Sequence, residues 1–426
     1  MTLALFLGVL IGAILLGLPV AFSLLLAALA LMVQLDSVSV DILSQSLING
    51  IDSFPLLAIP FFLVAGEVMS TGGLSRRIVR LATSLLGHRK GGLGYVAILT
   101  SVLLAGLSGS AVADAAALVS ILYPMMKQGG YPQGRSLGLL ASGGIIAPII
   151  PPSLPLIVVG VAGNISIAKL FLAGIAPGLM MGLALMVTWS ILVRHEPLEV
   201  SARVPGAERW QAFKGSFWAL LMPVIIIGGI RTGIVTPTEA AVVAAVYAIV
   251  VSMAFYREMT WGELVGALIR AGRATAMVMF LVGCAMVAAW LITIAQLPQQ
   301  LAAILGPLVE NPRLLMLVIM VIVFFVGMVM DLVPSVLILV PLLMPLVTMA
   351  GIDPVYFGLM FIMNSCIGLI TPPVGSVLNV VCGVGRAPMS TVVAGTLPFI
   401  GVYLLLLGLF ILFPALIVVP MNLIAG

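Results

Sequence analysis

The chain has 426 residues, of which 62% are hydrophobic and 8% are charged. Its mean hydropathy is +1.32. Soluble domains carry roughly 25% charged residues, so the composition excludes an ordinary soluble protein and indicates an integral membrane protein. The net charge of +4 does not indicate nucleic-acid binding, because the basic residues lie in short loops between apolar runs. The three cysteines (Cys284, Cys366 and Cys382) have unrelated spacings, which argues against a disulfide framework or a metal site.

The first apolar run, 3–34, is too long for one crossing, since roughly 20 helical residues span the hydrocarbon. It is best divided near Gly17-Leu18-Pro19 into two crossings. The run has no small-residue cleavage site at its end, so we expect no cleavable signal peptide. A third crossing is predicted from about Phe54 to Ser70.

Residues 74–87 follow an amphipathic pattern, with arginines on one face and leucine or isoleucine on the other. This spacing predicts either a helix in the membrane interface or a solvated loop helix. The apolar stretch 93–126 is interrupted at 108–114, and the stretch 136–163 is interrupted at 147–153. A further helix is predicted to end near Val193. The polar segment 194–214 is interpreted as a linker between two halves.

The second half repeats the first at a single offset of 221 residues. Tyr123-Pro124 matches Met344-Pro345, and Pro151-Pro152 matches Pro372-Pro373. AGIAP at 173–177 likewise matches AGTLP at 394–398, and Gly106 matches Gly327. Four matches in register, three of them with matched prolines, indicate a true internal repeat.

We predict an all-α polytopic membrane protein with two inverted-topology repeats, each containing a re-entrant helical hairpin and a proline-broken transmembrane helix. Each half is expected to make three crossings, then a hairpin that enters and returns on the same side, then two further crossings. Five crossings is an odd number, so the second half has the opposite orientation in the membrane. The predicted units are 1–193 (scaffold 1–90, hairpin and broken helix 91–193), the linker 194–214, and 215–426 (215–308 and 309–426).

Charge predicts which side of the membrane each loop occupies. With a cytoplasmic linker and both termini outside, 15 of the 18 Lys and Arg residues fall in inside loops. The three outside are Lys169, Arg231 and Arg313. The positive-inside rule therefore favours two periplasmic termini.

The broken helices read APIIPPS at 147–153 and LITPPVG at 369–375. Irregular backbone at membrane depth persists only where protein or a water-filled cavity satisfies its polar groups, and paired breaks in inverted repeats indicate a transporter binding site. Carbonyls freed by the prolines, with the hydroxyls of Ser153 and Thr371, are hard ligands that suit sodium better than a transition metal. Two ordinary proline kinks are the structural alternative.

The hairpin tips, 108–114 and 328–335, each carry an aspartate among apolar residues. An acid inside a membrane protein is by default a functional candidate, although Asp114 and Asp331 could also cap the returning half-helix. For Asp114 the two interpretations are even, whereas for Asp331, at the tip itself, we favour function. Glu67 is another acid in apolar context, and Glu239 fits a helix start.

Residues 106–109 read GLSG, like the serine motif of rhomboids, which raises the alternative of an intramembrane protease. Such an enzyme needs a histidine base on a neighbouring helix, and both His88 and His195 stand in charged loops. We therefore expect no enzyme. A channel-like pore remains an alternative, although two inverted halves fit alternating access better.

Four long stretches, 107–131, 143–178, 231–248 and 351–375, resemble the large membrane subunit of tripartite ATP-independent periplasmic (TRAP) transporters. The resemblance implies a sodium-coupled organic-acid importer that works in the bacterial inner membrane by an elevator movement of a transport domain against a scaffold. It also implies two partners: a small membrane subunit of about four helices and a periplasmic substrate-binding protein. Stretches 52–69 and 375–381 look more like sugar-acid members, of the diketogulonate or sialate kind, than dicarboxylate members.

The resemblance also implies two sodium sites made mostly of backbone carbonyls, with substrate between the tips near Ser110, Ser153 and Asp331. One sodium site would use residues around the first tip and break, namely Ser108, Gly109, Ser110, Gly144, Ala147, Ile149 and Pro151. The other would use residues around the second tip and break, namely Gly327, Met330, Ile370, Thr371, Pro373 and Gly375.

Overall fold

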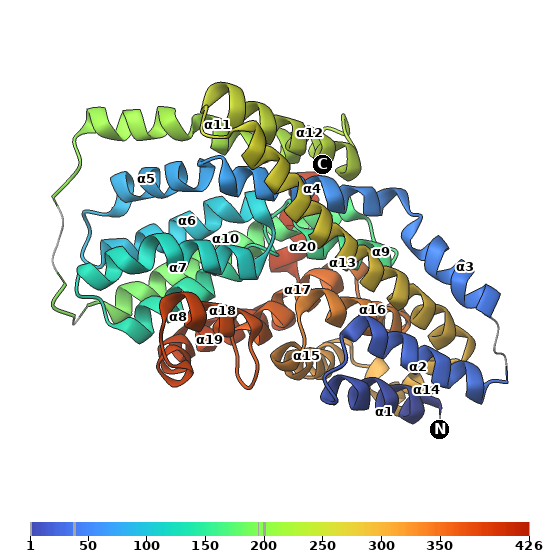
Figure 1. Cartoon of the computed structure of the whole chain (residues 1–426). Coiled ribbons are helices and arrows are strands. Elements are labelled where there is room, and N and C mark those ends of the chain that lie inside the picture. Colours follow the sequence, from blue (N-terminus) through green and yellow to red (C-terminus); the bar gives the residue numbers. More distant parts are fainter. Residues whose placement is uncertain (1, 37–39, 195, 199–201, 426) are drawn as a thin grey trace.

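The computed structural model describes residues 2–36, 40–194, 196–198 and 202–425. Within these ranges the regular structure is helical and contains no strand (Figure 1). Eight of the described helices are long and apolar enough to cross a membrane. The fold is thus the predicted all-α polytopic one.

The helices of the first half are α1 (Thr2–Leu15), α2 (Val20–Gln34), α3 (Val40–Ile51), α4 (Ala58–Thr71), α5 (Leu74–Leu86), α6 (Gly92–Ser108), α7 (Ala111–Gln128), α8 (Gln133–Gly144), α9 (Leu154–Ala162) and α10 (Ile167–Leu192). Those of the second half are α11 (Gly206–Arg231), α12 (Pro237–Val250), α13 (Trp261–Ile294), α14 (Leu297–Val309), α15 (Pro312–Val329), α16 (Leu332–Met349), α17 (Pro354–Leu369), α18 (Ser376–Gly385), α19 (Met389–Leu412) and α20 (Ala415–Ala425). A 3-10 turn (Phe54–Leu57) precedes α4, and a π-helical turn (Val251–Phe255) extends α12.

The helix boundaries confirm the internal repeat. Adding 221 to both ends of α7, 111 and 128, gives 332 and 349, the two ends of α16. The same offset carries the start of α8 at 133 to the start of α17 at 354. It also carries the start of α3 at 40 to the start of α13 at 261. α13 is continuous where α3 and α4 are separate, because Pro55 interrupts the first copy and Ala276 stands at the related position.

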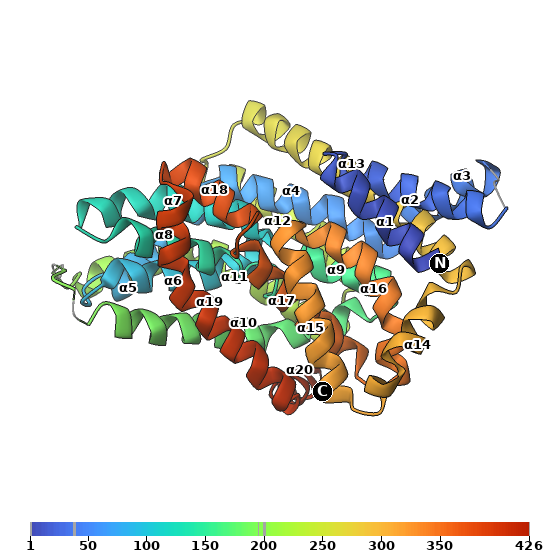
Figure 2. The ribbon, with the colours of Figure 1, turned by 90° about the horizontal axis from the view of Figure 1, so that it is seen from below.

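Helices of one half pack on helices of the other half, and these contacts occur in repeat-related pairs. α4 packs on α12, and its repeat-related pair is α13 on α2. In the same way α7 packs on α18 and α16 packs on α9. Such reciprocal pairs are those of an approximate two-fold axis, and both views show the halves interleaved rather than side by side (Figures 1 and 2). These contacts set a helix of each hairpin, α7 or α16, against the helix that follows the break of the other half, α18 or α9.

Several local expectations can be compared with the helices. The N-terminal run divides at Gly17, which has φ of +85°, and α2 begins after Pro19. α5 matches the predicted amphipathic helix, with Leu74 and Ile78 buried. The helix α3 has no counterpart among the predicted elements, and α11 begins at Gly206, inside the segment interpreted as the linker, 194–214. The first turns of α11 are polar, and its apolar residues come later, so the hydropathy pattern does not mark where the helix begins.

Three of the loops predicted to be cytoplasmic meet at one end of the molecule. Arg135 forms an ion pair with Glu196, and Lys90 Nζ donates to the Arg194 carbonyl at 2.9 Å. The α5–α6 turn and the start of α11 lie at this end, on the left of Figure 1, whereas the N-terminus lies on the right. The grouping agrees with a common side for these basic loops.

Candidate functional site

The first hairpin tip joins α6 to α7 by a two-residue turn. Gly109 adopts a left-handed conformation with φ of +63°, and Ser110 caps α7 by accepting a hydrogen bond from the Ala113 amide at 3.4 Å. A Cβ on Gly109 would lie 3.0 Å from both the Pro152 carbonyl oxygen and the Ser153 Cα. Glycine is therefore needed twice, for the backbone conformation and for the close approach to the first break.

The first break occupies 145–153, between α8 and α9, and every residue in it is buried. The carbonyl oxygen of Pro151 lies 3.4 Å from the Cβ position of Gly106, on the same hairpin. Ser153 is only 1% exposed. Its hydroxyl donates to the Pro148 carbonyl at 2.6 Å and accepts from the Leu156 amide at 3.4 Å. Ser153 is thus a helix cap whose hydrogen bonds close the break.

The second tip and break touch through the backbone. The Met328 carbonyl accepts from the amides of Val374 at 3.3 Å and Gly375 at 3.2 Å. The carbonyl oxygens of Thr371 and Leu369 lie 3.0 and 3.1 Å from the Cβ position of Gly375. Two carbonyl oxygens therefore converge on one point of this break, beside the hairpin.

Asp331 stands at the second tip as the N-cap of α16, and its Oδ1 accepts from the Leu332 amide at 2.9 Å. Its side chain is exposed, unlike Asp114, which is 5% exposed in the first turn of α7. Capping is therefore a real role of Asp331, as the structural alternative expected. Because Asp331 is exposed, the part of its carboxylate that does not cap the helix can be reached from the surface of the tip.

The structure brings most of the predicted cation-site residues together, in two separate groups. At the first tip, Gly109 meets the break directly, and Gly144 approaches Ala115 near the start of α7. The carbonyl oxygen of Ile149 lies next to the Cβ position of Gly174, in α10. Of Ser108, only the backbone lies within the described part. The remaining predicted positions lie in the tips and breaks themselves, namely Ser110, Ala147, Pro151, Gly327, Met330, Ile370, Thr371, Pro373 and Gly375.

The predicted substrate residues are not all on one surface. Ser110 lines a cavity of about 250 Å³ between α4 and the first hairpin, together with Glu67, Ser70, Ser75 and Asp114. Asp331 and Ser153 are not among the residues that line it. Ser70 of α4 and Ser75 of α5 were missed by sequence reasoning, because their place on the cavity wall depends on tertiary packing and no motif marks them.

Glu67 also forms an ion pair across the two halves. Arg270 Nε of α13 donates to Glu67 Oε2 at 2.8 Å, and Arg270 Nη2 donates to Thr71 Oγ1 at 3.0 Å. The side chains are 35% and 50% exposed, so the pair contributes at most about 1 kcal/mol. Glu239, by contrast, closes a capping box with Thr236, as expected.

The protease motif can be compared with only one histidine, because His88 alone lies in the described part of the chain. His88 lies before α6, whereas Ser108 ends it, and a helix of 17 residues separates the two by roughly 25 Å. His195 lies outside the described residues. The serine of the motif therefore has no base from His88.

Two hairpins seated on two broken helices, in halves related by an approximate two-fold axis, define a membrane transport protein. The sequence belongs to the family described as "Tripartite ATP-independent periplasmic transporter, DctM component", which it matches over residues 7–416. The chain is thus a large permease component of a TRAP transporter, and the two relatives described below are named permeases.

Two relatives and one solved structure place it further. It is 55% identical to the 2,3-diketo-L-gulonate TRAP transporter large permease protein YiaN of Escherichia coli, covering 99% of each chain. It is 39% identical to the sialic acid TRAP transporter large permease protein SiaM of Vibrio cholerae, covering 95% of each. The YdaH transporter of Alcanivorax borkumensis has a similar fold, with a TM-score of 0.65, 17% identity and 87% and 88% coverage.

Proposed function

We propose that this chain is the permease subunit of a sodium-coupled, binding-protein-dependent importer of a sugar acid. The observation that carries the proposal is the double arrangement of a hairpin tip on a proline break, with carbonyl oxygens directed to each contact. The greater identity to the diketogulonate permease than to the sialic acid permease favours a diketogulonate-like substrate. A C4-dicarboxylate substrate is the alternative within the family.

The donor atoms fit sodium. The carbonyls of Leu369 and Thr371 converge beside Gly375 at the second break, and those of Pro151 and Pro152 approach the first tip. No three His, Cys, Asp or Glu residues gather in the described part of the chain. Neutral carbonyl oxygens suit a hard monovalent cation, whereas a transition metal would want imidazole or thiolate. When bound, sodium would supply positive charge beside an organic anion.

The chain's own residues would then have distinct tasks. Ser110 and Asp331 lie at the two tips. The Ser110 hydroxyl would donate a hydrogen bond to the substrate, and the Asp331 carboxylate would accept one from a substrate hydroxyl. The breaks would hold the cations, and the two hairpins would move with them against the scaffold as an elevator. The reciprocal packing of α4 with α12 and α2 with α13 supports a scaffold built from both halves. A small membrane subunit and a periplasmic binding protein would complete the transporter.

The basic loops favour an orientation in the inner membrane with both termini periplasmic, since 15 of the 18 basic residues then face the cytoplasm. Cysteine labelling tests this orientation. Single cysteines near residues 2 and 424, in a variant lacking the native three, should react with a membrane-impermeant reagent from the periplasm. Reaction only after permeabilisation would reverse the assignment.

The function is tested by uptake of labelled 2,3-diketogulonate into proteoliposomes that contain this chain, its small subunit and the cognate binding protein. Uptake should require both an inward sodium gradient and the binding protein, and should saturate with substrate. Potassium in place of sodium should abolish it. Non-saturating flux without binding protein would favour a channel-like pore, and uptake of succinate in preference would favour the dicarboxylate alternative.

A further inference from the structure

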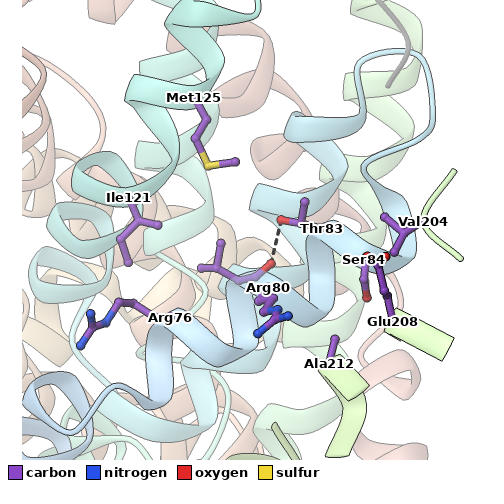
Figure 3. Close-up of a pocket in the computed structure, with 10 residues that line it drawn as sticks. Arg76, Arg80, Thr83, Ser84, Ile121, Met125, Val204, Glu208 and Ala212 are labelled. Atoms are coloured by element: carbon purple, nitrogen blue, oxygen red, sulfur yellow. Dashed lines mark hydrogen bonds between the residues drawn. The ribbon is translucent and has the colours of Figure 1, made fainter. Parts of the chain in front are cut away.

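A second cavity, of about 360 Å³, lies between α5, α7 and α11, away from both hairpin tips (Figure 3). Ile121 on its wall is eleven residues beyond Ser110, which along a helix is about 16 Å. Arg76 and Arg80 of α5 form one wall, Ile121 and Met125 of α7 another, and Glu208 stands on α11. The volume is within the range of small-molecule sites, about 300–1,000 Å³.

The two arginines on this wall differ from their neighbour Arg77. Arg77 is engaged away from the cavity, because it pairs with Glu258 and its guanidinium lies 3.9 Å from the centre of the Tyr256 ring. Arg76 reaches Glu258 only at 3.5 Å and its side chain is 72% exposed. Arg80 forms no ion pair with any described residue. Since Glu208 is the single acid among the lining residues, the cavity carries a net positive charge.

A second group of basic residues adjoins the cavity, one helical turn beyond its lining residue Ser84. The pKa of His88 is lowered below its ordinary value, mainly because burial removes water from the ring. The positive charges of Arg209, Arg203 and Arg89 lower this pKa further. Arg209 has buried Nε and Nη2 atoms that find no hydrogen-bond partner within the described ranges. Buried guanidinium N–H groups are normally paired, so Arg209 adds two unpaired donors to the positive charge beside the cavity.

The cavity is apolar as well as basic. Val79, Ile121 and Met125 line it beside the arginines, and α5 itself is amphipathic, with Leu74 and Ile78 buried and Arg80 exposed. A free phosphate would use only the guanidinium groups. A phospholipid would also use the apolar wall, and basic pockets between membrane helices commonly hold acidic headgroups.

We propose that the cavity between α5, α7 and α11 binds an anionic phospholipid, with the headgroup phosphate between Arg76 and Arg80 and an acyl chain along Ile121 and Met125. The occupant is phosphatidylglycerol or a lipid of the same charge class. This binding does not depend on the coupling ion or on the transported solute. It ties α5 and α11 to the hairpin helix α7.

The test is lipid binding to the purified full-length chain in an uncharged detergent. Thermal unfolding and native mass spectrometry would be followed with dioleoylphosphatidylglycerol, dioleoylphosphatidylcholine or inorganic phosphate. We expect phosphatidylglycerol to raise the unfolding temperature and to remain bound in the spectrometer. In the Arg76→Gln/Arg80→Gln variant its affinity should be roughly 30-fold weaker, which is about 2 kcal/mol at tenfold per 1.4 kcal/mol.

The matched control is Arg231→Gln/Arg313→Gln, which removes two exposed charges elsewhere and should bind phosphatidylglycerol as the unaltered chain does. Glu208→Gln provides an independent variant, and it should bind the lipid more tightly because the cavity loses its acid. Equal weakening in the control, equal binding of phosphatidylcholine, or unchanged affinity in both cavity variants would overturn the proposal. Displacement of the lipid by millimolar phosphate would overturn it in favour of a small-anion site.

Discussion

The two hairpin tips occupy the same place in the repeat but differ in chemistry and exposure. Adding 221 to Ser110 gives Asp331, and both residues cap the returning helix of their hairpin. Four residues further on, Asp114 corresponds to Ser335, so the serine and the aspartate have exchanged positions. One architecture therefore presents a buried acid behind a serine at one tip and an exposed acid at the other.

The two breaks differ in the same direction. Residues 145–153 are buried throughout, whereas Pro373 and Val374 of the second break are exposed, Val374 by 41%. The first break is closed by Ser153, and the second has Val374 at the related position. The repeat therefore fixes the backbone path, whereas the polar atoms along that path differ between the two copies. The second tip is the more open of the two to a solute.

The largest effect should come from Gly109→Ala at the first tip. Gly130, which has φ of +73° and no atom within 4 Å of its Cβ position, is the matched control. Gly130→Ala should lower the free energy of unfolding by about 1–2 kcal/mol, the cost of a left-handed alanine. Gly109→Ala should cost about 1–3 kcal/mol more, because its Cβ presses on Pro152. Thermal unfolding measures both, and equal losses would show that the tip is not seated on the break.

Asp331→Asn separates capping from a need for charge at the second tip. Asparagine caps helices as well as aspartate does, so stability should be retained. Uptake of the transported acid should fall roughly 10- to 100-fold if a charge-assisted interaction of about 1.5–3 kcal/mol is lost. Ser335→Ala, one turn further along α16, is the control and should transport normally. Unchanged uptake by Asp331→Asn would show that Asp331 serves only to cap α16 and that its negative charge is not needed for transport.

Ser153→Ala tests the structural role that the first break assigns to this serine. Its hydroxyl bonds to Pro148 and Leu156 and is buried, so the change should cost about 1 kcal/mol of stability. The apparent Michaelis constant for the transported acid should change by less than twofold. A large increase in that constant at unaltered stability would instead restore Ser153 as a substrate contact.

The internal repeat, the hairpins and the broken helices could be predicted from the sequence, because paired prolines mark the breaks. Pro151-Pro152 and Pro372-Pro373 mark the breaks, and their shared offset predicted the repeat and both hairpins. The atoms that meet at each break could not be predicted, because they depend on packing between helices far apart in sequence. The direction of the Ile149 carbonyl towards Gly174 and the cavity shared by Ser70 and Ser110 are two such cases.

The smallest effect concerns the ion pair beside the first tip, which the second half lacks. Glu67 and Arg270 join α4 to α13, whereas Ala288 and Asn49 stand at the related positions. A double-mutant cycle of Glu67→Gln and Arg270→Gln should give a coupling of about 0.2–1 kcal/mol that shrinks as salt rises, since both side chains are partly exposed. Glu67 also lines the Ser110 cavity, so Glu67→Gln alone should alter uptake more than Arg270→Gln does. Equal changes in uptake would mean that only the pair matters, and that the first tip gains nothing from this acid beyond its contact with α13.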